Sequence, residues 1–126
     1  MTDSDKKLER YVALVPLLRF HQPIAVGQWV RLEPETGAIL GPHQAVPESA
    51  LKADPVDPSV LRGMVESRAC FADGALQYAR RVLGLSTADC IRLAHEHAEE
   101  FVKRHGSALA LVQGIGEAEL KKWAKK

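Results

Sequence analysis

Histidine and glutamate side chains cluster between residues 95 and 100, and both residue types can bind metal ions. His95 and Glu99 are four residues apart, so on a helix they lie on one face and can reach the same ion. His97 lies about 200° around the helix from His95. The chain contains neither His-Glu-x-x-His nor Cys-x-x-Cys. We therefore expect a solvated polar face without a metal, with His95 and Glu99 as the metal candidates.

Residue patterns typical of catalytic sites are missing from the chain. There is no Gly-x-Ser-x-Gly and no glycine-rich phosphate loop ending in Lys-Ser or Lys-Thr. Asp54 and Asp57 are each followed by proline, which indicates turns rather than acid–base chemistry. The two cysteines, Cys70 and Cys90, fit the role of small buried side chains with free thiols. We expect no catalytic residues, no cofactor and no enzymatic activity.

The segment from residue 107 to residue 123 combines apolar positions with two closely spaced glycines. Its pattern is Leu109, Val112, Gly114-Ile115-Gly116, Leu120 and Trp123. This pattern resembles the helix-hairpin-helix motif, a family that binds DNA without regard to base sequence. The resemblance implies that the tight turn presents backbone N–H groups to a phosphate, with lysines close by. The residues that it implicates are Gly114, Ile115, Gly116, Lys121, Lys122 and Lys125.

The same segment departs from the motif at three positions. Glu117 and Glu119 place negative charge beside the turn, and Leu120 occupies a position that is small in the motif. An alternative interpretation needs no ligand: the two glycines turn the chain between two helices, and the lysines complement the dipole of the last helix.

Charge and composition narrow the classes of function. The 126 residues include 17 Lys and Arg against 16 Asp and Glu, so the net charge is only +1. Because phosphate contacts dominate the affinity for nucleic acid, this balance excludes a large basic surface, although not a local one. No apolar run approaches the roughly 18 residues of a membrane span, and residues 1–11 show no signal-peptide core. We expect a cytoplasmic protein with no membrane contact.

The N-terminal half reads as strands and loops, and it holds all seven prolines. Residues 11–15 are predicted to form a strand at a sheet edge or with a bulge, because Pro16 follows. Residues 28–32 and 38–40 are predicted to form a hairpin around the turn at 33–37. Beyond it we expect a tethering loop with one helical turn at 48–52.

Helical periodicity begins at residue 59. Helices are predicted from 59 to 69, from 73 to 83, from 87 to 105, and from 117 onward. Gly84 and Gly106 are predicted to end two of them, and Ser86 with Asp89 forms a capping box for the longest.

The predicted fold is therefore α+β: a small N-terminal antiparallel β-hairpin element in residues 1–58, then a bundle of about four helices in residues 59–126, together forming one compact domain. We expect a non-enzymatic cytoplasmic adaptor or regulatory protein whose partner is another protein or a second copy of itself. Trp29 and Trp123 are the candidate contact residues. Trp29 also fits the core, and Trp123 either packs on the bundle or stays exposed. The alternative is weak DNA binding through the C-terminal segment.

Overall fold

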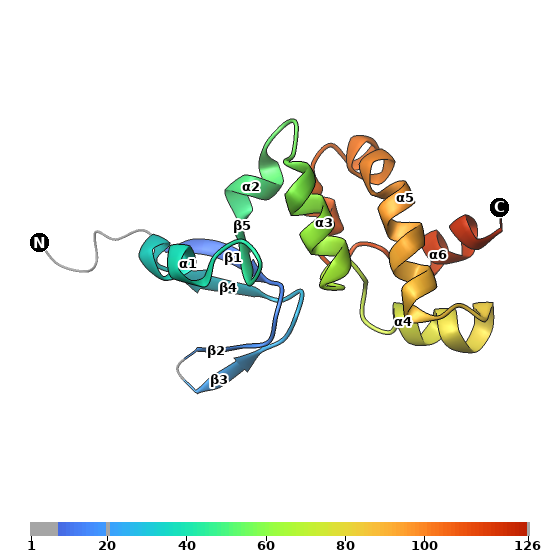
Figure 1. Ribbon diagram of the computed structural model, residues 1–126, viewed down its shortest axis with the longest axis horizontal. Helices are drawn as coiled ribbons and strands as arrows, with labels where there is room; N and C mark the ends of the chain where they lie inside the picture. Colours follow the sequence, from blue (N-terminus) through green and yellow to red (C-terminus); the bar gives the residue numbers. More distant parts are fainter. Residues whose placement is uncertain (1–7, 20, 126) are drawn as a thin grey trace, which may run out of the picture.

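The computed structural model describes residues 8–19 and 21–125, and it is α+β, as predicted (Figure 1). The N-terminal half contains β1 (Glu9–Ala13), β2 (Leu17–Arg19), β3 (Gln22–Ile24), β4 (Trp29–Leu32), α1 (Pro34–Leu40), β5 (Ala45–Pro47) and α2 (Glu48–Lys52). The C-terminal half contains α3 (Pro58–Glu66), α4 (Ala75–Tyr78), the π-helical turn η2 (Ala79–Leu83), α5 (Thr87–His105), the 3₁₀ turn η3 (Ala108–Leu111) and α6 (Glu117–Ala124). The helical turn predicted at 48–52 is confirmed as α2.

The main sheet has the order β4-β1-β5, and both pairs are antiparallel. Tyr11 lies opposite Val30 of β4 and opposite Pro47 of β5. The prediction of an edge strand at 11–15 is therefore wrong, because β1 is the central strand and ends at Ala13, before Pro16. A separate two-stranded ribbon is formed by β2 and β3.

The hairpin predicted between residues 28–32 and 38–40 is also wrong. Residues 34–40 form helix α1, and β4 pairs with β1 instead. Pro34 stands in the first turn of α1, where its fixed φ and missing N–H are tolerated, and Glu35 complements the helix dipole there. Gly37 lets α1 approach the sheet, because a Cβ at this position would fall about 2.2 Å from the phenol of Tyr11.

The two faces of the main sheet contact different parts of the molecule. Val12 and Val46 lie in a large core that continues through the helices to Trp123. Tyr11 and Val30 lie in a second, smaller cluster, which Leu40 of α1 and Leu17 and Ile24 of the ribbon help to cover. The alternation of side chains along a strand produces this division. The helical half and the sheet therefore share one core.

The long helix α5 follows the sequence prediction. It spans Thr87–His105, and Gly106 ends it in a left-handed conformation. The side chain of Ser86 accepts a hydrogen bond from the backbone N–H of Asp89, and the Asp89 carboxylate accepts one from the N–H of Ser86. These bonds lower the pKa of Asp89. Within the described residues, α5 and the other helices are too short or too polar to cross a membrane.

Candidate interaction site

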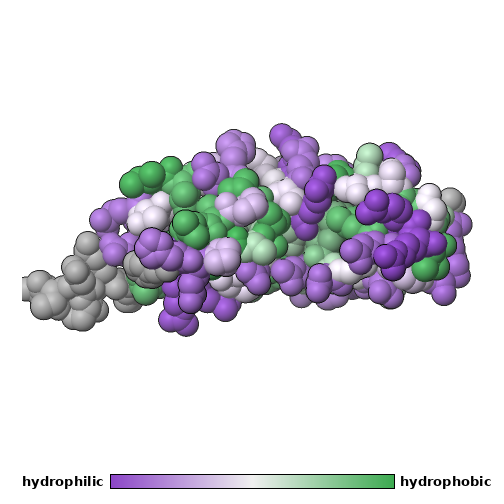
Figure 2. Space-filling model, turned by 90° about the horizontal axis from the view of Figure 1, so that it is seen from below, coloured by the Kyte–Doolittle hydropathy of each residue, from purple (hydrophilic) through white to green (hydrophobic). Residues whose placement is uncertain are grey.

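An apolar groove lies between the ribbon, the outer part of β4 and helix α1. Its volume is about 200 Å³. The residues that line it are Leu17, Leu18, Arg19, Val30, Leu32, Thr36 and Leu40. Figure 2 views the molecule from the side that carries the ribbon, and hydrophobic residues gather there in the half nearer the N-terminus. The groove is smaller than the roughly 300–1,000 Å³ sites that hold drug-sized ligands, so it suits an anchoring side chain.

Two strongly exposed apolar side chains lie on the elements that form this groove. Leu18 lines it and is 70% exposed, and Ile39, the neighbour of Leu40 on α1, is 84% exposed. Thr36 and Leu40 are four residues apart, so both fall on the face of α1 that meets the groove. Gly37 holds another part of α1 against Tyr11. Docking of α1 on the sheet thus forms one wall of the groove.

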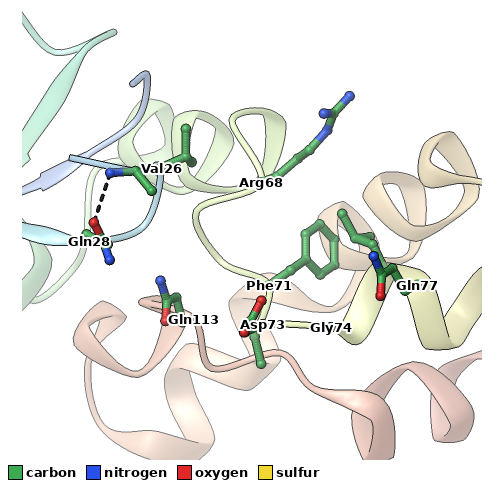
Figure 3. A pocket seen from close by; sticks show the side chains of 11 residues that line it. Val26, Gln28, Arg68, Phe71, Asp73, Gly74, Gln77 and Gln113 are labelled. Atoms are coloured by element: carbon green, nitrogen blue, oxygen red, sulfur yellow. Dashed lines mark hydrogen bonds between the residues drawn. The ribbon is translucent and has the colours of Figure 1, made fainter. Parts of the chain in front are cut away.

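A cavity of about 460 Å³ lies between the N-terminal and helical halves. Gln28 and Gln113 border it on one side, and Phe71, Asp73 and Gln77 border it on the other (Figure 3). The Gln28 amide oxygen already accepts a hydrogen bond from the N–H of Ala25. Five of the eleven lining residues are polar and exposed, whereas small-molecule sites are lined predominantly by apolar side chains. The cavity can hydrogen-bond a polar group, and it contains no nucleophile paired with a base.

The Gly114-Ile115-Gly116 segment uses its backbone N–H groups inside the fold. The N–H of Gly114 donates to the carbonyl of Leu111, and that of Ile115 donates to the carbonyl of Cys70, 2.9 Å away. The N–H of Gly116 donates to the Glu119 carboxylate at 2.9 Å. Ile115 is fully buried and forms an isolated parallel bridge with Phe71. The N–H groups that a bound phosphate would need are therefore already engaged.

The helices on either side of this segment are unequal. The residues before it form only the short 3₁₀ turn η3, and the second helix is present as α6. Lys121, Lys122 and Lys125 are all exposed on α6. Lys122 lines a small cavity of about 130 Å³ against α5, where Glu100 and Glu119 also lie. Lysine charge is thus available at this end of the molecule without the phosphate-binding turn.

His95 and Glu99 line one cavity of about 230 Å³ beside α3, so the structure brings these two metal candidates together. His95 Nε2 lies 3.7 Å from an oxygen of Glu66, a contact that becomes an ion pair when the histidine is protonated. Across residues 8–19 and 21–125, no three His, Cys, Asp or Glu side chains are arranged to hold a metal ion.

The two tryptophans are both covered by other side chains. Trp29 is half-buried against the large core, and the guanidinium of Arg10 lies 4.2 Å from the centre of its ring. Arg10 also binds Glu48 at 2.6 Å, which lowers the pKa of that carboxyl. Trp123 is 7% exposed and stacks on His97, with ring centres 4.7 Å apart. Trp29 and Trp123 thus pack within the fold, whereas Leu18, which lines the groove, and Ile39 on α1 are strongly exposed.

Sequence reasoning missed the groove because two of the three elements that form it, β2 and α1, were not predicted. The ribbon of β2 and β3 and the helix α1 meet only in the folded chain. The adjacent pair Leu17-Leu18, directly after Pro16, was the available signal for a partly exposed apolar strand.

Both cysteines are free and fully buried. Burial raises the pKa of the Cys70 thiol to about 12, and burial followed by the nearby Asp89 charge raises that of Cys90. Because the thiolate is the reactive form, we expect the folded protein to react with a disulfide reagent at pH 8 at least about a thousandfold more slowly than the urea-unfolded chain. Absorbance of the released thiol measures both rates. Rapid reaction of one thiol in the folded protein would contradict the buried positions.

Comparisons with known proteins identified no relative of this chain. The chain matches no protein-family model, and it has no significant match to a curated protein or a solved structure.

Proposed function

We propose that the protein is a non-enzymatic cytoplasmic adaptor or regulatory protein that acts through protein–protein contacts at the apolar groove. The observation that carries this proposal is the 70% exposure of Leu18, which lines the groove, together with the 84% exposure of Ile39 on helix α1, which forms one wall of it. Isolated apolar side chains on a surface are ordinary, but an exposed apolar side chain that lines an apolar groove is typical of an interaction site. The occupant that this shape fits is a partner segment that inserts one apolar side chain.

The environments of the reactive groups support a role without catalysis. The two thiols are buried, and the raised pKa of Cys70 keeps it protonated at neutral pH. Free cysteines are also typical of a reducing compartment, which supports the cytoplasmic assignment. The cavity of about 460 Å³ contains polar side chains without an acid–base pair.

The test is a photo-crosslinking residue placed at position 18 in the cell, combined with the double variant Leu18→Asp/Ile39→Asp. We expect one partner, or a second copy of the chain, to crosslink at the groove. The double variant should weaken that complex at least about tenfold, because burying two carboxylates in an apolar contact costs several kcal/mol. Light scattering distinguishes self-association from binding to another protein.

The matched control is Leu8→Asp, which introduces the same charge at an apolar side chain that is 49% exposed and does not line the groove. This variant should bind normally. The proposal is wrong if the purified protein is a strict monomer and no crosslinked partner depends on Leu18 and Ile39.

A further inference from the structure

A second surface lies at the opposite end of the long axis from the groove, where η2 and α6 come together (Figure 1). It carries Arg80, Arg81, Lys121 and Lys125, all exposed, and we call these four residues the basic end. None of these four side chains forms an ion pair with an acidic side chain of the described residues. Their charges are therefore open to solvent.

The pairing of the chain at residues 71 and 115 explains why the two segments that carry these cations lie close together. The N–H of Ala72 donates to the carbonyl of Ile115, so α4 and α6 begin from adjacent points. The turn η2 continues α4, and it packs along α6. Leu120 and Trp123 bury one side of α6, and Lys121 and Lys125 share an exposed face at i,i+4 spacing. The two helical segments that carry these basic residues thus lie side by side.

The acidic groups nearby do not cancel this charge. Residues 75–86 include no Asp or Glu. Asp89, which follows, is held by the N–H of Ser86 and lies 3.9 Å from Arg92. Glu119 accepts the Gly116 N–H at the other end of α6, where Glu117 also lies. The C-terminal dipoles of the two helices offset about one charge in total, so most of the positive charge remains.

An exposed apolar side chain accompanies these cations. Val82 is 63% exposed and directly follows Arg81 in η2. A π-helical turn is rare, and such turns occur frequently at functional sites. Nucleic acid backbones are bound by cations and N–H groups, and an apolar side chain adds little there. The N–H groups at 114–116 are engaged, and Glu117 and Glu119 repel phosphate. An acidic protein segment with apolar residues matches both the charge and Val82.

We propose that the basic end binds an acidic, leucine-containing segment of a partner protein, with Arg80, Arg81, Lys121 and Lys125 facing its carboxylates and Val82 contacting an apolar side chain. This binding is independent of the groove, since the two surfaces share no residue.

The experiment is a fluorescence anisotropy titration of the full chain with a labelled short peptide of alternating glutamate and leucine. A glutamate–serine peptide and a short duplex DNA serve as the other two probes. All three probes are titrated in buffers that contain about 0.05 M or about 0.15 M salt. We expect the glutamate–leucine peptide to bind most tightly. The double variant Arg81→Glu/Lys121→Glu should lower the affinity for this peptide at least about tenfold, and Val82→Ser should lower it about fivefold.

The control variant Lys52→Glu/Lys103→Glu changes the net charge equally at lysines outside the basic end, and it should bind like the wild type. The groove variant Leu18→Asp/Ile39→Asp should also keep the affinity, so failure of one surface does not imply failure of the other. Circular dichroism confirms that each variant folds. Tighter binding of DNA than of either peptide, no binding of the glutamate–leucine peptide, or equal losses in both charge-reversal variants would each overturn the proposal.

Discussion

Replacing Gly114 with alanine is expected to lower the free energy of unfolding by roughly 3–5 kcal/mol, more than alanine at Gly37, Gly63 or Gly116. A Cβ at this position would stand 1.7 Å from the backbone carbonyl oxygen of Ala110. A carbonyl within a turn cannot rotate away as a flexible side chain can. The adjacent Ile115 must also keep its hydrogen bond to Cys70, so the segment cannot shift to make room.

Gly116→Ala is the matched control for this prediction. A Cβ there would meet the Glu119 carboxylate at 3.5 Å and Ala72 at 3.9 Å, which are ordinary contacts. We expect a change within about 1 kcal/mol. Urea denaturation followed by circular dichroism measures both variants. Similar stabilities for the two variants would show that the glycines act alike, as in a simple turn between helices.

Gly37→Ala is expected to destabilise the protein by about 2–3 kcal/mol and to displace helix α1. Its Cβ would overlap the phenol of Tyr11, whose pKa is raised mainly by burial. Because Thr36 and Leu40 form a wall of the groove, the displaced helix should also lose the partner that depends on Leu18. Hydrogen exchange at residues 34–40 reports the local change, and thermal denaturation reports the global one.

Gly63→Ala provides the comparison, since it adds the same methyl group inside another helix. Its Cβ would meet only the end of the Leu14 side chain at 3.4 Å. Alanine is the better helix former, so we expect a stability that is unchanged or raised by up to about 1 kcal/mol. Equal destabilisation by Gly37→Ala and Gly63→Ala would show that overlap with Tyr11 does not cause the loss of stability.

Local signals predicted the helical half well. Ser86 and Asp89 define the start of α5, and Gly106 defines its end, because caps depend on residues within one turn of the helix. The α+β class also followed from the change of periodicity near residue 59.

The errors lie where distant residues decide the structure. Residues 34–40 contain both a plausible turn and a plausible helix start, and contact between Gly37 and Tyr11 favours the helix. Gly114 and Gly116 look alike in the sequence, yet only a Cβ at Gly114 would meet a carbonyl oxygen, that of Ala110. Between the two glycines, Ile115 pairs with Phe71 more than forty residues earlier. Neither relation has a signal in the local pattern.

The core shared by the sheet and the helices has a consequence for any protein that binds both ends. Val12 and Val46 of the sheet belong to the same packed cluster as Leu120 and Trp123 of α6, so no hinge or linker separates the groove from the basic end. A partner bound at the groove and a partner bound at the basic end would therefore be held at a fixed distance and orientation. Their effective concentration for each other would depend on shape rather than on the length of a flexible tether.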